Sequence, residues 1–159
     1  ALEVNEAWLL GYENPNSTAE LVEKFPNIRP VHLKQFPILG EIACGKPIFA
    51  EEERGSFLMA SDEIHADFCL LAHGDSMTGA RIYDGDAVFI RSQPMVENGE
   101  IAAVIINDEA TLKRVYFDRK QARLQLVAEN PAYPPLVYVG EELETVHILG
   151  KAIAFMSLL

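Results

Sequence analysis

Short apolar runs broken by turn-forming residues constrain the fold of this chain more than any other feature. From Phe36 onward these runs alternate with Gly, Pro, Asn and Asp, in turns such as Asp84-Gly85-Asp86 and Glu97-Asn98-Gly99. Short strands separated by turns of this kind are typical of a mostly antiparallel β domain. The expected strands are Ile38–Ala43, Phe68–His73, Ala87–Arg91, Ile101–Ile106, Ala110–Phe117, Arg123–Ala128 and His147–Met156.

One β-hairpin is predicted more specifically than the rest. Asn107-Asp108 lies between the apolar runs Ala102–Ile106 and Thr111–Tyr116. Two such runs joined by a short Asn/Asp turn indicate antiparallel strands that pair around the turn.

The segment before Phe36 has a different residue pattern. Residues 1–12 predict one short helix, with Asn5 as its N-cap and Gly11 as its stop. Residues 13–37 contain closely spaced prolines and asparagines and are expected to form a linker with a single helical turn near Thr18–Lys24.

The composition excludes several functions. The chain has 159 residues, an apolar fraction of 49% and a net charge of −11. An acidic surface repels phosphate backbones, so this chain is not expected to bind DNA by itself. Cys44 and Cys69 are too few for a disulfide framework, and no Cys/His cluster predicts a metal site or a cofactor. No apolar run has the length of a membrane span, and a cytoplasmic protein is expected.

Ser76 is the first residue that could carry chemistry. It follows the apolar run Leu70–Ala72 and the small polar turn at Gly74-Asp75. A glycine lets the backbone turn sharply, so a serine can project from the end of a strand beside free backbone N–H groups. A serine after Gly-Asp is also a common turn residue or helix cap, and the tripeptide alone does not distinguish these roles.

A nucleophilic serine needs a base, and the sequence offers two kinds. His73 would suggest a Ser–His–Asp triad, but a residue on the strand before the turn need not face the same way as Ser76. His32, His65 and His147 have no evident Asp or Ser context. A histidine-based triad is therefore disfavoured.

Lys113 is the better candidate for the base. Strand alternation places it on one face with Thr111 and Val115. Burial on a partly apolar face lowers the pKa of a lysine amine, and a neutral amine can accept a serine proton. The alternative is a surface lysine paired with Asp108 or Glu109, and the residue pattern alone leaves it open.

A third feature supplies a possible substrate. The apolar stretch Ile38–Ile48 is centred on the small residues Ala43, Cys44 and Gly45. Small side chains let an extended backbone approach a nucleophile, and Gly45 has no Cβ to block attack on the Cys44 carbonyl. Read alone, the segment could equally be a strand and turn.

Taken together, these segments resemble the peptidase part of the LexA, phage repressor and UmuD family. The resemblance runs in order from about Phe36 to Leu159. Its motifs are Gly74-Asp75-Ser76-Met77, Ile82-Tyr83-Asp84-Gly85-Asp86, Val96–Ala102, Ala110-Thr111-Leu112-Lys113-Arg114, Leu126–Pro131 and Ile148–Ala152. Each motif is weak, but six in the family's order are specific.

The resemblance implies a LexA-like and signal-peptidase-like β fold and an S24-type serine–lysine peptidase that cuts its own chain. Ser76 would be the nucleophile, Lys113 the base, and the backbone N–H groups of Ser76 and Met77 the oxyanion donors. The cut bond would be Cys44–Gly45, where Cys44 replaces the commoner alanine and looks like the UmuD variant. Residues 38–50 would form the cleavage-site segment, and residues 51–159 the peptidase and dimerisation domain. Residues 1–12 resemble the end of a helix-turn-helix DNA-binding domain, which favours a truncated repressor.

The same resemblance implies partners that the residues do not show. They are a second copy of the chain in a homodimer, a RecA filament or an antirepressor as trigger, and operator DNA through the missing N-terminal domain. Cleavage would inactivate repression.

Three other readings compete with a self-cleaving repressor. A repressor domain that dimerises or binds an effector without cleaving is disfavoured because Ser76, Lys113 and Cys44–Gly45 occur together. A peptidase acting on other proteins, like the signal peptidases, is disfavoured because no membrane segment is evident. A UmuD-like polymerase accessory subunit is disfavoured by the repressor-like residues 5–12.

Overall fold

The computed structural model describes residues 18–39 and 57–159. The predicted helix over residues 1–12, most of the cleavage-site segment 38–50 and the Cys44–Gly45 bond lie outside the described residues. The chain divides into two compact units, Ala1–His32 and Leu33–Leu159. In the described part of the first unit, α2 spans Thr18–Lys24, which confirms the predicted helical turn. No helix within the described ranges is long and apolar enough to cross a membrane.

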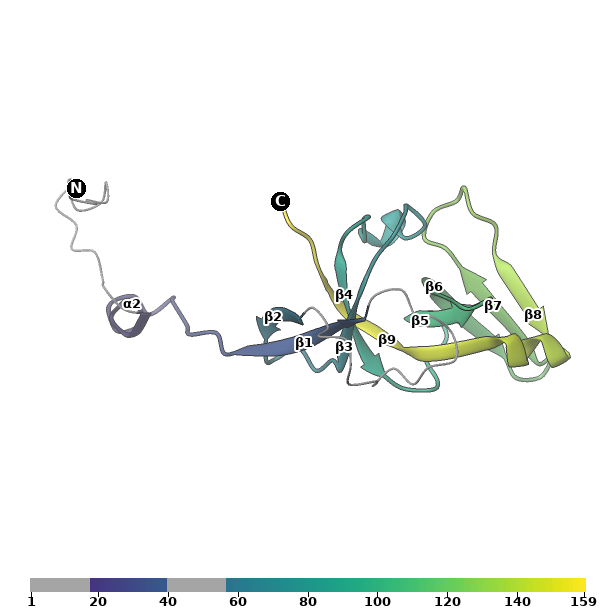
Figure 1. Cartoon of the computed structure of the whole chain (residues 1–159), viewed down its shortest axis with the longest axis horizontal. Coiled ribbons are helices and arrows are strands. Elements are labelled where there is room, and N and C mark those ends of the chain that lie inside the picture. Colours follow the sequence, from purple (N-terminus) through teal and green to yellow (C-terminus); the bar gives the residue numbers. More distant parts are fainter. Residues whose placement is uncertain (1–17, 40–56) are drawn as a thin grey trace. The chain divides into compact units, whose positions relative to one another are not determined.

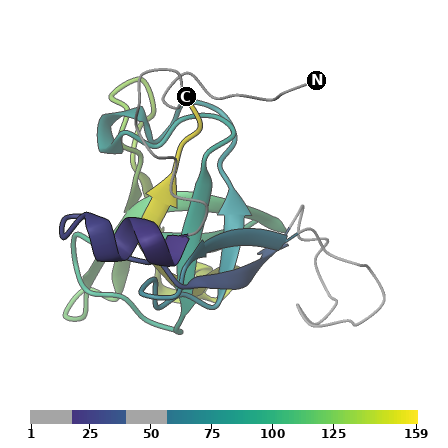
Figure 2. The ribbon, with the colours of Figure 1, turned by 90° about the vertical axis from the view of Figure 1, so that its left-hand side faces the viewer.

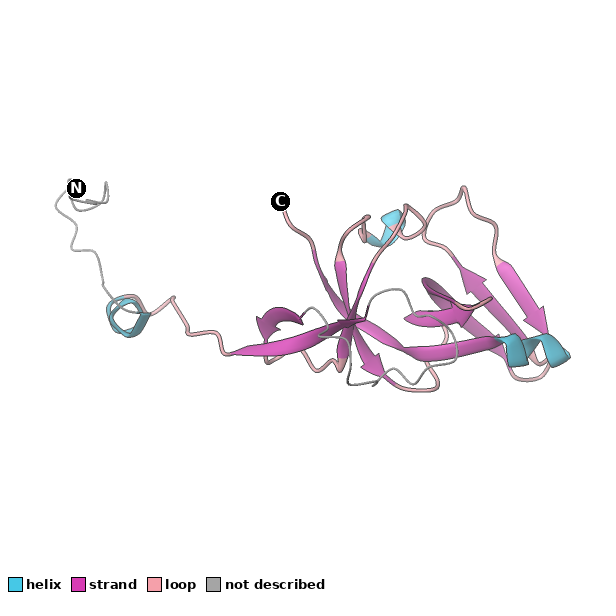
Figure 3. Cartoon of the chain, viewed as in Figure 1, coloured by secondary structure: helices cyan, strands magenta, loops and turns pink. Residues whose placement is uncertain are grey.

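The second unit is built on one mixed β-sheet (Figures 1 and 3). Its strands lie in the order β2-β1-β3-β4-β9-β5-β6-β7-β8, and every described pair is antiparallel except β1 with β3. This confirms the expected mostly β fold of largely antiparallel strands. The strands are β1 (Leu33–Leu39), β2 (Phe57–Ser61), β3 (Phe68–Leu71), β4 (Ala87–Ser92), β5 (Ile101–Ile106), β6 (Glu109–Asp118), β7 (Arg123–Val127), β8 (Leu136–Val139) and β9 (Val146–Met156), with short 3₁₀ turns η1 (Thr78–Ala80) and η2 (Gly140–Thr145).

The β5–β6 hairpin confirms the prediction made from its turn residues. Ile106 pairs with Glu109, which leaves Asn107 and Asp108 as the two-residue turn. Both turn residues have positive φ, 49° and 71°. A tight turn that follows the strand twist needs this conformation, and Asn and Asp tolerate it better than other side-chain-bearing residues.

Two strands were not predicted, and one begins earlier than expected. β1 starts at Leu33, inside the range expected as linker, and it includes Ile38 and Leu39, the described residues of the predicted strand Ile38–Ala43. Its sequence contains Lys34, Gln35 and Pro37, which weaken a strand signal. β2 and β8 were missed because β2 has no β-branched residue and only five residues in all, and β8 is short and follows two prolines.

Three apolar clusters form the core and anchor the later site. The first includes Ile90, Leu112 and the two residues that flank η1, Met77 and Ile82. The second lies under β5, β6 and β7. In the third, the rings of Phe36 and Phe89 meet edge to face, with centroids 5.1 Å apart. Burial of Met77 and Ile82 fixes the turn between them against the sheet.

The third cluster also contains one of the two cysteines. Cys69 is fully buried, and this burial raises the pKa of its thiol to about 11. A buried thiol of high pKa is a poor nucleophile and a poor metal ligand, so Cys69 acts as a small apolar core residue.

Candidate functional site

Ser76 lies in a turn that hydrogen bonds hold from both sides. After β3, the N–H of Ala72 donates to the Asp86 carbonyl and the N–H of Gly85 donates to the Ala72 carbonyl, each at 2.8 Å. Gly74 has a φ of 77° and donates its N–H to Asp84 Oδ1 at 2.8 Å. The positive φ at Gly74 is the sharp bend that the sequence predicted.

Asp86 makes this arrangement rigid. It is the one buried charged side chain in the described ranges, with 6% of its surface exposed. Its carboxylate accepts hydrogen bonds from the Tyr83 N–H at 2.7 Å and from the Ser157 hydroxyl at 2.6 Å. A buried carboxylate with satisfied oxygens locks the loop behind Ser76 to the chain that leaves β9.

The backbone at Ser76 and Met77 is available to a ligand. Among residues 18–39 and 57–159, neither the Ser76 N–H nor the Met77 N–H has a hydrogen-bond acceptor. Met77 is buried, whereas Ser76 is half-buried. Two adjacent unpaired N–H groups beside a serine hydroxyl can stabilise negative charge that develops on a nearby oxygen.

Lys113 is half-buried in β6, where it pairs with Ala102 of β5. Its amine donates to Thr111 Oγ1 at 2.9 Å and to the Leu112 carbonyl at 3.0 Å. Burial lowers the pKa of this amine below the ordinary lysine value. In the described part of the chain Lys113 has no carboxylate partner, so the surface ion pair with Asp108 or Glu109 is not formed.

The structure brings Ser76 and Thr111, the hydrogen-bond partner of Lys113, to one cleft of about 640 Å³. Within the described ranges, Ser76 and Lys113 make no hydrogen bond with each other. The Lys113 amine instead contacts Thr111, which lines the cleft. The cleft is lined by both apolar and polar residues. Its lining is Leu39, Leu70, Leu71, Ala72, His73, Gly74, Ser76, Met77, Ile82, Asp108, Glu109, Ala110, Thr111 and Leu112.

His73 does not form a triad with Ser76. Its side chain is 79% exposed, and Nδ1 lies 3.8 Å from Asp84 Oδ1. Within the described ranges it makes no hydrogen bond with Ser76. Its exposure agrees with the interpretation that favoured Lys113 over a histidine.

The sequence did not predict the contact between the Ser76 turn and the segment that follows β7. Asn130 Nδ2 donates to the Asp75 carbonyl at 3.0 Å, and the Gly79 N–H donates to the Glu129 carbonyl at 2.6 Å. The Glu129 side chain in turn pairs with Arg114, the neighbour of Lys113. The only sequence signal for this contact was the Glu-Asn pair inside a family-like motif.

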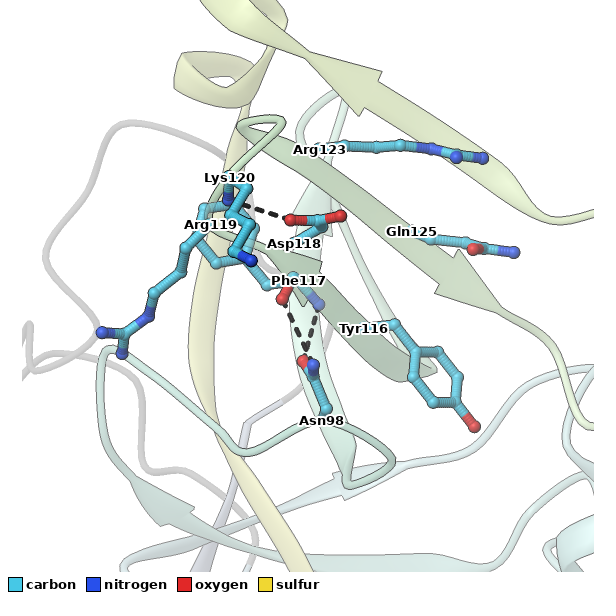
Figure 4. Close-up of a pocket in the computed structure, with 8 residues that line it drawn as sticks. All are labelled: Asn98, Tyr116, Phe117, Asp118, Arg119, Lys120, Arg123 and Gln125. Carbon is cyan, nitrogen blue, oxygen red and sulfur yellow. Dashed lines mark hydrogen bonds between the residues drawn. The ribbon is translucent and has the colours of Figure 1, made fainter.

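A second hollow, of about 510 Å³, lies at the β6–β7 turn (Figure 4). Asn98 holds this turn by donating to the Phe117 carbonyl at 3.2 Å and accepting from the Phe117 N–H at 2.7 Å. Figure 4 shows Arg119 and Arg123 pointing in different directions, so these cations do not converge on one ligand. The hollow shares no residue with the Ser76 cleft.

Comparison with known proteins decides the family. The Peptidase S24-like family matches residues 37–153, which include Ser76, Lys113 and the Cys44–Gly45 bond. The chain belongs to the LexA-like S24 family. It is 36% identical to the LexA repressor of Oleidesulfovibrio alaskensis over 94% of this chain and 73% of the relative.

Two further relatives agree with this family assignment. The LexA repressor of Leptospira interrogans is 37% identical, over 82% of this chain and 66% of the relative. The LexA repressor of Magnetococcus marinus is 39% identical, over 85% of this chain and 61% of the relative. The LexA-like chain therefore spans about two thirds of the length of these relatives.

Proposed function

We propose that this LexA-like chain is the switch domain of a repressor that inactivates itself by cutting its own Cys44–Gly45 bond. Ser76 is the nucleophile and Lys113 is the base. The observation that carries the proposal is the shared cleft, because Ser76 and Leu39 line it together. Leu39 is the last described residue before the segment that contains Cys44.

The chain geometry supports a tethered substrate. Cys44 follows Leu39 after five residues, and an extended chain covers at most ~3.6 Å per residue, or roughly 18 Å. The far end of the segment returns at Phe57, which pairs with Pro37 of β1. Both ends are therefore anchored close to each other, and a tethered bond needs no tight binding pocket to reach the nucleophile.

The proposed reaction moves one proton between Ser76 and Lys113. Neutral Lys113 Nζ accepts the Ser76 hydroxyl proton as Oγ bonds to the Cys44 carbonyl carbon. The free N–H groups of Ser76 and Met77 stabilise the resulting oxyanion. The C–N bond to Gly45 then breaks, and Lys113 returns the proton to the leaving Gly45 nitrogen. Water hydrolyses the Ser76 ester and restores the hydroxyl.

The hydrogen bonds of Lys113 suit this role. A neutral amine keeps two N–H groups, and the structure gives it two acceptors, Thr111 Oγ1 and the Leu112 carbonyl. The lone pair then remains free for the Ser76 proton. Reaction requires the amine to turn from Thr111 toward Ser76, which lines the same cleft as Thr111.

The repressor role rests on the relatives. Because they are LexA repressors, we propose that the LexA-like chain dimerises through its β domain and binds operator DNA through an N-terminal helix-turn-helix domain. A RecA filament or an antirepressor would trigger cleavage by favouring the state in which the segment over residues 38–50 lies in the Ser76 cleft. The cut then separates the DNA-binding part from the dimerising part.

The pH dependence of cleavage tests the proposal. The pKa of Lys113 is lowered below the ordinary 10.5, so the fraction of neutral amine rises as the pH passes a midpoint below that value. The first-order cleavage rate of the purified chain should therefore increase from pH 7 toward alkaline pH and then level off. Ser76→Ala should show no cleavage at any pH. A rate that stays flat over this range would contradict the proposal.

A further inference from the structure

The turn that carries Ser76 is bound to the segment after β7 through its backbone. Both views place η1 beside that segment (Figures 1 and 2). A Cβ on Gly79 would lie 2.3 Å from the Glu129 carbonyl oxygen, so the two backbones are in direct contact. Tyr133 adds a hydrogen bond from its hydroxyl to the Asp75 carboxylate.

The hydrogen bonds to the Asp75 carbonyl bear most directly on the chemistry. This oxygen accepts from Asn130 Nδ2 at 3.0 Å and from Thr78 Oγ1 at 3.1 Å, and a longer bond of 3.4 Å comes from the Thr78 N–H. The Asp75 carbonyl and the Ser76 N–H belong to the same peptide group, which is planar and trans. They point in opposite directions, so fixing the carbonyl also fixes the direction of the N–H.

That N–H is one of the two unpaired donors beside the Ser76 hydroxyl. A donor that stabilises an oxyanion acts only when it is aimed in advance at the position of the developing charge. Nothing else among the described residues binds the Ser76 N–H. Its direction therefore depends on what holds the Asp75 carbonyl.

We propose that Asn130 is a positioning residue that aims the Ser76 N–H at the oxyanion of the cleavage reaction. The inference rests on the proposed function, since it assigns Asn130 to the same reaction. Thr78, within the turn, holds the same Asp75 carbonyl through its hydroxyl. Within the described ranges Asn130 makes no hydrogen bond with Lys113, so its effect should fall on the rate of the chemical step and leave the titration of the amine unchanged.

The test measures the pH–rate profile of self-cleavage for the parent chain and two variants. Asn130→Asp loses the Nδ2 donor but keeps Oδ1, which accepts from the Ala132 N–H at 3.0 Å. Thr78→Val removes the other side-chain donor without adding charge. Both should lower the plateau rate about tenfold while the midpoint pH stays in place, because misdirected donors stabilise the transition state less.

Asn98→Asp is the matched control. Asn98 also donates Nδ2 to a backbone carbonyl and accepts on Oδ1, but at the β6–β7 turn, outside the cleft (Figure 4). Its plateau rate should remain within about twofold of the parent. Thermal melting and circular dichroism of each variant show whether it folds, and Thr78→Val decides the question if Asn130→Asp does not fold.

The outcomes separate this inference from the proposed function. If the parent chain does not cleave, the proposed function fails. If the parent cleaves and both variants keep its plateau rate within about twofold, the positioning role of Asn130 is wrong while the proposed function stands. A shift of the midpoint pH with an unchanged plateau, or an equal loss in Asn98→Asp, also overturns the positioning role.

Discussion

Replacing Lys113 with methionine should slow self-cleavage about 10²–10⁴-fold at the alkaline plateau, the range by which a positioned general base accelerates a reaction. Methionine keeps the length and the apolar contacts of the side chain but has no amine. The Ser76 proton then loses its assigned acceptor, and His73 makes no hydrogen bond with Ser76 within the described ranges that could replace it. The rate of loss of the intact chain on gels measures the effect.

Two further variants make the Lys113 result specific. Lys113→Arg keeps a positive charge that does not titrate in this range, so it should be as slow as the methionine variant. Lys120→Met makes the same chemical change at the exposed β6–β7 turn and should cleave at the parental rate (Figure 4). Cleavage of Lys113→Met within tenfold of the parent would exclude the assigned base.

Replacing Phe89 with alanine should lower the free energy of unfolding by about 3–5 kcal/mol. Phe89 is 1% exposed, lies in the third core cluster and packs edge to face on Phe36. The substitution removes an aromatic side chain from a buried site and leaves a cavity that rigid strands cannot fill. Urea unfolding followed by circular dichroism, on a Ser76→Ala background to prevent cleavage, measures the loss.

Phe155→Ala is the control for this stability prediction. Phe155 lies in β9 opposite Val88, but 41% of its surface is exposed. The same change should therefore cost less than about 1.5 kcal/mol, since much of the ring is already in water. Equal losses in the two variants would show that the Phe36–Phe89 contact does not form the core described above.

Local patterns in the sequence were sufficient to predict most strands of the described sheet. The runs that became β4, β5, β6 and β7 were located closely because their apolar residues alternate or cluster between strong turn signals. The turn at Asn107-Asp108 was predicted because its backbone conformation selects those residues. β2 and the first part of β1 were not predicted because their local pattern does not indicate a strand, and these segments become strands by pairing with each other across a long connection.

The candidate site, too, could be predicted only in part from the sequence. Ser76 and Lys113 were chosen from local motifs and a family resemblance, and the described structure puts Ser76 in a cleft and Lys113 beside it. The contact of Asn130 with Asp75 could not be predicted, because it joins residues 55 positions apart through one side-chain hydrogen bond. Neither hydrophobic period nor turn chemistry signals a contact of that kind.

Intact-mass measurement after alkaline incubation tests the central claim most directly. The parent chain should give two fragments that meet at the Cys44–Gly45 bond, and Ser76→Ala treated in parallel should remain whole. A parent chain that stays intact, a cut at another bond, or the same cut in Ser76→Ala would contradict the assignment of this LexA-like domain as its own peptidase.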